Sequence, residues 1–243
     1  MSLMKTMIRK SQERGKVEAG WLKSMHSFSF GSYHDEDHMG FGPLRVINED
    51  WIGEGSGFGM HPHEDMEIMT ILLEGELEHK DSLGTKGLLK PGEVQLMSAG
   101  VGIVHSEFNH SKEDSLHLYQ IWIEPSEKGL EPKYQQKDFS KELENSRWTL
   151  LASSEASNGE LKIHQDAQIW RLQTEDQSAY GGQVLKAKKV WVQVLKGSVL
   201  VSNNELNQGD AFGVEEISEY DLSEIKINDQ SGLQTDVMVF IFN

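Results

Sequence analysis

Two short motifs, His-Pro-His at residues 61–63 and His-Ser-Glu at residues 105–107, bring together residue types that bind transition metals. In a β-strand, the side chains of residues i and i+2 project from the same face. If each motif lies on a strand, His61 and His63 point into one cavity, and His105 and Glu107 repeat that geometry from a second strand. We therefore predict a metal site with these four residues as its ligands. The alternative is that the histidines lie on the surface or are satisfied by hydrogen bonds in the core.

The chemistry of this ligand set narrows the choice of metal. Three neutral imidazoles and one carboxylate offer nitrogen and oxygen donors, which suit Fe(II), Mn, Co, Ni or Cu(II). The chain has no cysteine, so thiolate ligands are excluded and a structural zinc site is disfavoured. We predict one divalent transition metal per chain, with Fe(II) favoured and Mn, Co, Ni, Cu or Zn as alternatives.

Four protein ligands would leave two positions of an octahedron open, and this vacancy indicates function rather than structure. A chelating substrate oxygen and O₂ can use those positions. Glu107 can also accept a proton, because a carboxylate has lone pairs to spare. We therefore predict that Glu107 is catalytic as well as a metal ligand.

The elements that must position these residues are strands. Residues 190–195 and 237–242 are rich in β-branched and aromatic side chains, and glycine-containing turns recur at short intervals along the chain. This pattern predicts an all-β protein built from sandwiches or barrels. Helical signal is scarce, with one short helix expected within residues 138–146.

An internal repeat indicates two domains. Residues 72–77 and 90–94 form a strand, a glycine turn and a second glycine-acidic turn, and residues 194–199 and 207–211 repeat that order. We predict two tandem copies of one β-fold, with residues 1–143 as the metal-binding domain and residues 144–243 as the second domain.

The repeat also predicts that the second domain is metal-free. Along the sequence, each of the four predicted ligands stands a fixed number of residues from Gly75 or Gly92. The same offsets can be counted from the corresponding glycines of the second repeat, Gly197 and Gly209. They lead to a set of positions without histidine: Gln183, Leu185, Leu222 and Glu224. His164 stands alone in this half of the sequence, so we expect it to be structural.

Composition excludes several classes of partner. The 23 lysines and arginines against 39 aspartates and glutamates give a formal net charge of −16, which repels nucleic acid, and the sequence has no basic stripe. No apolar stretch approaches the ~20 residues of a membrane span, and the N-terminus lacks the apolar region of a secretory signal. We expect a cytoplasmic protein that binds neither nucleic acid nor a membrane, while protein partners remain open.

The two metal motifs resemble those of cupins, and the chain as a whole resembles the pirin family, especially the bacterial pirin-like quercetin 2,3-dioxygenases. The likeness covers most of residues 15–135 and continues more loosely through residues 164–166 and 190–192. It is carried by the following segments: 26–30, 39–41, 44–48, 59–67, 73–75, 78–82, 91–92, 97–100, 105–109 and 117–122.

The resemblance implies a bicupin fold of two jelly-roll barrels, with His61, His63, His105 and Glu107 as the metal ligands. It also implies that Glu67, a ligand in many other cupins, is a neighbour of the site rather than a ligand. Glu64 departs from the family pattern, because relatives often carry a basic residue there, and this difference bears on substrate preference.

The function that the resemblance implies is a metal-dependent dioxygenase that cleaves flavonols such as quercetin at the 2,3 position with O₂. A small aromatic substrate is therefore expected, and Phe28, Phe30 and Phe41 either line its cavity or pack in the core. A pirin-like, redox-responsive regulatory protein that acts through protein partners is the alternative. Another small-molecule cupin, such as an isomerase, is a third interpretation.

Overall fold

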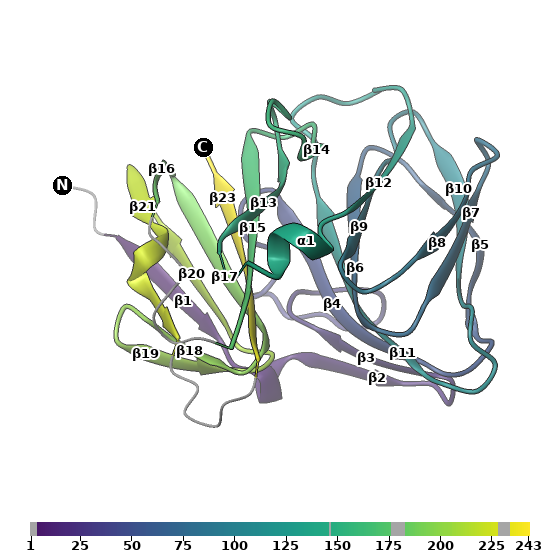
Figure 1. The fold of residues 1–243 in the computed structure, drawn as a ribbon, viewed down its shortest axis with the longest axis horizontal. Coiled ribbons are helices and arrows are strands. Elements are labelled where there is room, and N and C mark those ends of the chain that lie inside the picture. The colour runs from purple at the N-terminus through teal and green to yellow at the C-terminus, as the bar shows by residue number, and fades with distance from the viewer. Residues whose placement is uncertain (1–3, 146, 176–182, 228–233) are drawn as a thin grey trace. The chain divides into compact units, whose positions relative to one another are not determined.

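The computed structural model describes residues 4–145, 147–175, 183–227 and 234–243, and strands dominate them (Figure 1). The chain folds into two compact units. The N-terminal unit comprises residues 15–140 and 163–165. The C-terminal unit comprises residues 1–14, 141–162 and 166–243. The predicted boundary after residue 143 did not anticipate that residues 1–14 belong with the second half of the chain.

The N-terminal unit contains one large and one small antiparallel sheet. Its strands are β2 (Gly15–Glu18), β3 (Leu22–His26), β4 (Leu44–Ile52), β5 (Gly57–His63), β6 (Glu67–Glu74), β7 (Leu77–Asp81), β8 (Lys86–Leu89), β9 (Glu93–Ser98), β10 (Ile103–Asn109), β11 (Leu116–Ile123) and β12 (Lys133–Asp138). The large sheet has the order β12-β9-β6-β11-β4-β3-β2, and the small sheet has the order β5-β10-β7-β8. The small sheet therefore carries both predicted metal motifs.

The C-terminal unit repeats this plan. Its strands are β1 (Lys5–Arg9), β13 (Thr149–Ser153), β14 (Leu161–Lys162), β15 (Ala167–Thr174), β16 (Val184–Lys186), β17 (Lys189–Lys196), β18 (Ser198–Val201), β19 (Asn204–Asn207), β20 (Ala211–Glu215), β21 (Glu219–Asp221), β22 (Ile225–Ile227) and β23 (Thr235–Phe242). The large sheet has the order β1-β20-β17-β23-β15-β13-β14. Smaller groups pair β16 with β21 and set β18 between β19 and β22.

Corresponding strands occupy corresponding places in the two large sheets. In the N-terminal unit, β12 pairs with β9, which follows the second glycine turn; in the C-terminal unit, β1 pairs with β20, which follows the matching turn. Figure 1 shows this first strand of the chain, drawn in purple, beside β20. The edge of the large sheet is thus formed by β12 in the N-terminal unit and by β1, the first strand of the chain, in the C-terminal unit. The predicted all-β bicupin fold is confirmed.

Helical structure is as sparse as the sequence predicted. Within the described residues it comprises the single α-helical turn α1 (Ser140–Leu143) and the 3₁₀ turns η1 (Ser11–Glu13) and η2 (Leu222–Glu224). No helix in the described part of the chain is long and apolar enough to cross a membrane.

Candidate metal centre

The two predicted motifs lie on neighbouring antiparallel strands, β5 and β10. His61 is directly opposite His105, and His63 is directly opposite Ile103. Directly opposed residues of an antiparallel pair share a face of the sheet. The register shifts between His105 and Glu107. At that point a Cβ on Gly57 would lie 2.2 Å from the Glu107 carbonyl oxygen, so only glycine allows the close approach of the two backbones.

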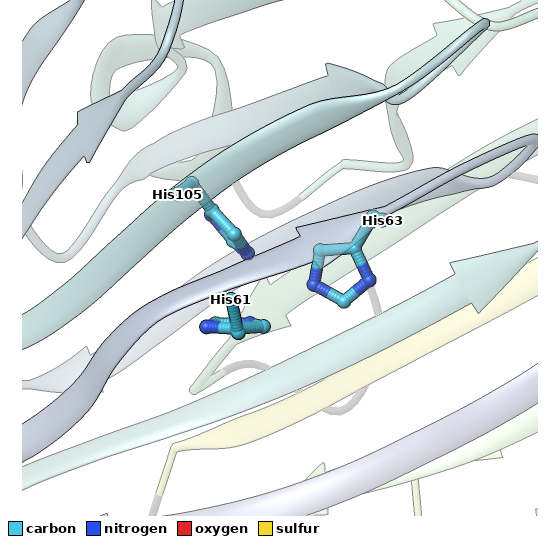
Figure 2. A group of neighbouring side chains, drawn as sticks. All are labelled: His61, His63 and His105. Carbon is cyan, nitrogen blue, oxygen red and sulfur yellow. The ribbon is translucent and has the colours of Figure 1, made fainter.

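The three imidazoles converge, as Figure 2 shows. The ring centroids of His61 and His105 are 4.5 Å apart, and the ring of His63 lies 4.8 Å from each of the other two. One ligating nitrogen from each ring falls within 4.8 Å of the others. The i, i+2 geometry expected of His61 and His63 is therefore realised, with His105 contributed by the neighbouring strand.

In two of these rings, one nitrogen is available to bind a metal. Nδ1 of His61 lies 2.8 Å from the carbonyl oxygen of Gly59. A carbonyl can only accept, so Nδ1 carries the proton and Nε2 keeps its lone pair. Nε2 of His105 is buried and has no hydrogen-bond partner among the described residues. A buried nitrogen without a partner is costly unless a ligand satisfies it, so the donor set fits a transition-metal ion.

The electrostatics also favour neutral imidazoles. Burial, followed by the influence of His61, lowers the pKa of His63 to about 4. Burial, followed by the influence of His61 and His63, lowers the pKa of His105 to about 2. Both imidazoles are therefore uncharged at neutral pH, with one nitrogen free of a proton, which is the state that binds a metal.

Glu107 is buried beside this cluster, with 2% of its surface exposed. Burial raises the pKa of its carboxyl group. Gln120 Nε2 donates a 2.6 Å hydrogen bond to Oε2, and Thr70 Oγ1 lies 3.5 Å from Oε1. The structure groups Glu107 with His79 and His105 rather than with all three predicted histidine ligands. Its assignment as the fourth ligand and as the catalytic base therefore stays a prediction.

His79 is a member of the site that the sequence did not identify. Its side chain is fully buried, its Nε2 donates to Asp81 Oδ2 at 3.1 Å, and its Nδ1 lies 3.5 Å from Nδ1 of His105. A neutral His79 protonated on Nε2 has a lone pair on Nδ1, so it can accept the Nδ1 proton of His105 and leave Nε2 of His105 for a metal. His79 and Asp81 thus hold the ring of the candidate ligand His105 in one tautomer. The i, i+2 spacing of this pair on β7 was the available signal.

A row of polar side chains crosses the large sheet of the N-terminal unit at the level of Glu107. Its members are directly opposed on consecutive strands. From β3 to β12 they are His26, Asn48, Gln120, Thr70, Gln95 and Gln136. Two of them, Gln120 and Thr70, contact the carboxylate of Glu107. We refer to these six residues as the polar row.

A cavity of about 350 Å³ borders the site. His61, His63 and Glu107 line it, together with aromatic walls from Phe30, Phe58 and Trp122. The Phe30 and Trp122 rings meet edge to face at 5.3 Å, and the Trp122 ring lies 4.7 Å from that of His63. His61, His63 and Glu107 therefore face a space of a size and polarity suited to a small aromatic molecule.

Other residues singled out in the sequence have different roles. Phe28 and Phe41 are buried in the core, so among the three phenylalanines only Phe30 lines the cavity. Oε1 of Glu67 lies 3.3 Å from Nδ1 of His164, and the carboxylate also accepts from Ser98, which fits the expectation of a structural His164. Glu64 is exposed and does not line the cavity.

The positions predicted to correspond in the C-terminal unit do correspond. The N–H of Leu222 donates to the carbonyl oxygen of Gln183, which repeats the opposition of His105 and His61. Gln183 and Glu224 are exposed, whereas Leu185 and Leu222 belong to an apolar core. These side chains do not form a ligand set.

Comparison with protein families gives two matches along the chain. Residues 7–123 match the model of the Pirin family, and residues 150–237 match that of the Quercetinase C-terminal cupin domain. Together they span both repeats.

Individual relatives agree with these matches. The quercetin 2,3-dioxygenase of Escherichia coli K12 is 46% identical over 209 residues, which cover 85% of this chain and 88% of that protein. The crystal structure of Escherichia coli YhhW superposes with a TM-score of 0.89 at 40% identity over 98% of both chains. A structure of the bacterial pirin YhhW in complex with nickel(II), from the same organism, has a TM-score of 0.86 at 40% identity and covers 98% of this chain and 99% of that one.

Proposed function

This chain belongs to the pirin family, and we propose that it is a metal-dependent dioxygenase that cleaves flavonols such as quercetin at the 2,3 position with O₂. The observation that carries the proposal is the convergence of three imidazoles beside a buried carboxylate at the wall of an aromatic-lined cavity. The relatives named for quercetin 2,3-dioxygenase activity support the choice of substrate class.

His61, His63 and His105 would hold the metal, with Glu107 as a fourth ligand. Such an ion would supply a Lewis acid and a redox-active centre for O₂ chemistry. Fe(II) is the favoured metal, with Mn, Co, Ni, Cu or Zn as alternatives, and the nickel(II) complex of the Escherichia coli relative supports a divalent transition metal. The cytoplasmic location remains a prediction from the sequence.

The chain's own residues would bind the flavonol and move one proton. A flavonol carries a 3-hydroxyl group beside a 4-carbonyl group, and its flat rings suit the space between Phe30, Phe58 and Trp122. Glu107 faces that space and can take the proton of the 3-hydroxyl group, which leaves the ring electron-rich at C2. Gln120 holds Glu107 in place through the 2.6 Å hydrogen bond to Oε2. The apolar walls would reduce the contact of the bound rings with water.

A turnover assay tests this function. The protein would be purified without chelator, its metal content measured, and O₂ uptake followed together with the loss of flavonol absorbance. Replacing Glu107 with Gln keeps the shape of the side chain but removes its charge, so we expect a loss of roughly 10²–10⁴-fold in turnover. Glu224→Gln is the matched control, because Glu224 is the exposed residue at the corresponding position of the C-terminal unit. Fully loaded protein that turns over no flavonol would contradict the proposal.

A second candidate function is supported by the outer face of the metal-bearing strands. Met60, Pro62 and Val104 are exposed on the face opposite the ligands, and Val104 is directly opposite Pro62. A regulatory pirin could present this apolar face to a protein partner in one oxidation state of its metal. Hydrogen exchange of β5 and β10 in oxidised and reduced metal-loaded protein would test it. Equal exchange in both states would count against the regulatory function.

A further inference from the structure

The cavity has a polar wall that the proposed chemistry does not use. Ser24 on β3 and Asp50 on β4 are directly opposed, and both line the cavity. They are next to the opposed pair of His26 and Asn48, whose side chains satisfy each other through a 2.7 Å hydrogen bond between His26 Nδ1 and Asn48 Oδ1. These strands belong to the large sheet, whereas the imidazoles come from β5 and β10 of the small sheet.

Among the described residues, only one of the two carboxyl oxygens of Asp50 has a hydrogen-bond partner. Ser24 Oγ donates to Oδ1, and no other hydrogen bond from the described residues reaches the carboxyl group. The residue is 3% exposed, yet it lines the cavity, so Oδ2 is the atom left for a molecule that enters. Burial, with the charges of Glu107 and Glu49, raises the pKa of Asp50 to about 7. The group can therefore either donate or accept a hydrogen bond near neutral pH.

A buried carboxyl oxygen beside aromatic walls calls for a particular ligand chemistry. A polar group removed from water costs free energy unless it gains a partner. An uncharged hydroxyl group satisfies Asp50 in either protonation state, because it can both donate and accept. A carboxylate on the ligand would be repelled by Glu107, which lies in the same cavity. The surrounding Phe30 and Phe58 favour a hydroxyl group carried on an aromatic ring.

We propose that Asp50, supported by Ser24, binds a second phenolic hydroxyl group of the substrate, distinct from the hydroxyl group presented to Glu107. This inference rests on the proposed function for the identity of the substrate as a flavonol. It deepens that function, because it makes this wall of the cavity select flavonols that carry further ring hydroxyl groups. Asp50 is then a substrate-binding residue, and Ser24 positions it.

Equilibrium binding without O₂ tests the proposal directly. The ligands are 3-hydroxyflavone, which has no other hydroxyl group, galangin, which adds hydroxyl groups on the A ring, and quercetin, which has them on both ring systems. The metal-loaded wild type should prefer at least one hydroxylated flavonol to 3-hydroxyflavone. In Asp50→Leu we expect this preference to fall by about 10-fold, the loss typical of one hydrogen bond to a buried partner. The affinity for 3-hydroxyflavone should stay nearly unchanged.

Two further variants keep the test decisive if Asp50→Leu fails to fold. Asp50→Asn preserves the shape of the side chain, and Ser24→Ala frees Asp50 without removing it; each should lower the preference by a smaller factor. Asp37→Asn, an exposed change that does not line the cavity, is the control and should leave the preference intact. In turnover, the variants should raise KM for the hydroxylated flavonol more than they lower kcat.

The outcomes separate this inference from the proposed function. An unchanged preference in folded Asp50 and Ser24 variants, or a wild type with no preference, would overturn the inference. If the wild type binds hydroxylated flavonols selectively through Asp50 but turns none over, the binding site stands and the dioxygenase function fails. If turnover occurs with no dependence on Asp50, the dioxygenase function stands and the inference fails.

Discussion

The polar row of the N-terminal unit has a counterpart in the C-terminal unit with the opposite chemistry. The six corresponding residues are again directly opposed on consecutive strands. From β13 to β1 they are Leu150, Trp170, Val239, Val192, Phe212 and Ile8. Thr70 and Val192 both stand five residues before the glycine of the first turn, and Gln95 and Phe212 both stand three residues after the glycine of the second.

The difference teaches what the cupin sheet needs and what the site needs. The same backbone positions accept six polar or six apolar side chains, so the sheet does not require either set. In the C-terminal unit Trp170, Val239, Val192 and Phe212 belong to an apolar core and Leu150 packs against it, whereas Ile8 at the sheet edge is exposed. In the N-terminal unit Gln120 and Thr70 instead hydrogen-bond to Glu107. The polar row is therefore a feature of the site rather than of the fold.

The ligand-bearing strand differs in a parallel way. In the N-terminal unit β10 runs unbroken past His105 and Glu107 and pairs with both β5 and β7. The corresponding stretch of the C-terminal unit is divided into β21 and β22 by the 3₁₀ turn η2, which spans Leu222 to Glu224. The turn occupies the positions that correspond to the two candidate ligands, His105 and Glu107. One continuous strand places His105 among the imidazoles and Glu107 at the cavity, and its interruption leaves Leu222 buried and Glu224 exposed.

The largest difference between the units should appear when the predicted ligands are removed from the N-terminal unit and the corresponding residues are removed from the C-terminal unit. We expect wild-type protein to carry about one transition-metal ion per chain, and His61→Ala with His63→Ala to carry none and to lack activity. The protein should stay folded, because the strands have apolar cores that do not depend on a metal. Elemental analysis and circular dichroism would measure both properties.

The matched control for this experiment is Gln183→Ala with Glu224→Ala. Both residues are exposed and correspond to His61 and Glu107, so metal content and activity should match the wild type. Metal retained by the histidine variant, or two ions bound per wild-type chain, would contradict the difference between the units.

Substituting one residue of the polar row, and the corresponding residue of the C-terminal unit, should give an intermediate effect. The property that changes should be metal affinity in the first case and stability in the second. Gln120→Leu removes the hydrogen bonds to Glu107 and from Trp122 Nε1, so metal affinity should fall by roughly 10–100-fold, as for the loss of an outer-shell partner. Val239→Gln places an amide in the apolar core without a partner and should lower the free energy of unfolding by about 1–3 kcal/mol.

Metal titration and urea denaturation of both variants would distinguish the two roles. Gln120→Leu should change metal affinity more than stability, and Val239→Gln the reverse. If both variants lose only stability, the polar row is structural in each unit.

The smallest effect expected is the pH dependence of stability that histidines give to the N-terminal unit. All ten histidines belong to the N-terminal unit. The pKa of His63 drops from 6.5 to about 4 on folding, so between these values the unfolded chain binds more protons than the folded one. The contribution of His63 to the stability of metal-free protein is therefore fully present above pH 6.5 and is lost as the pH falls toward 4.

Other shifted groups of this unit modify the dependence, among them His105 and Asp50. His105, with a pKa of about 2, acts in the same direction and extends the loss to lower pH. Asp50, whose pKa rises from 3.8 to about 7, acts oppositely, because its contribution is lost as the pH rises through that range. Urea denaturation of metal-free wild type and His63→Gln between pH 4 and 7 should give a shallower acid slope in the variant. Identical slopes in the wild type and the variant would show that folding does not lower the pKa of His63.

The sequence predicted the repeat and the grouping of the histidines because both depend on local spacing. The i, i+2 alternation of a strand places His61 with His63, and the glycine turns fix the register that identifies Gln183 and Leu222. The partners of Glu107 could not be predicted in this way. Gln120 and Thr70 meet Glu107 only because two sheets face each other, and no spacing along the chain records which strands become neighbours.

The same limit applies to Asp50, His79 and β1. In the sequence Asp50 is the second acidic residue of the polar run Asn48-Glu49-Asp50, and only the opposition of β3 and β4 reveals that Ser24 donates to one of its carboxyl oxygens. Residues 5–9 read as the start of the first domain, yet their hydrogen-bonding partner is about 200 residues away. The assignment of Glu107 as the fourth ligand remains a prediction, because the structure groups it with His79 and His105 and not with all three histidines. A register shift separates Glu107 from His105 on β10.

That distant pairing of β1 sets an order for folding during synthesis. Lys5 pairs with Glu215 and Arg9 with Ala211, so β1 leaves the ribosome long before its partner exists. At roughly 5–20 residues per second, the wait lasts on the order of 10–40 s. Throughout that time the first strand of the chain presents an unpaired edge. The C-terminal sheet can close only after almost the whole chain has been made, whereas all the strands of the N-terminal unit are available much earlier.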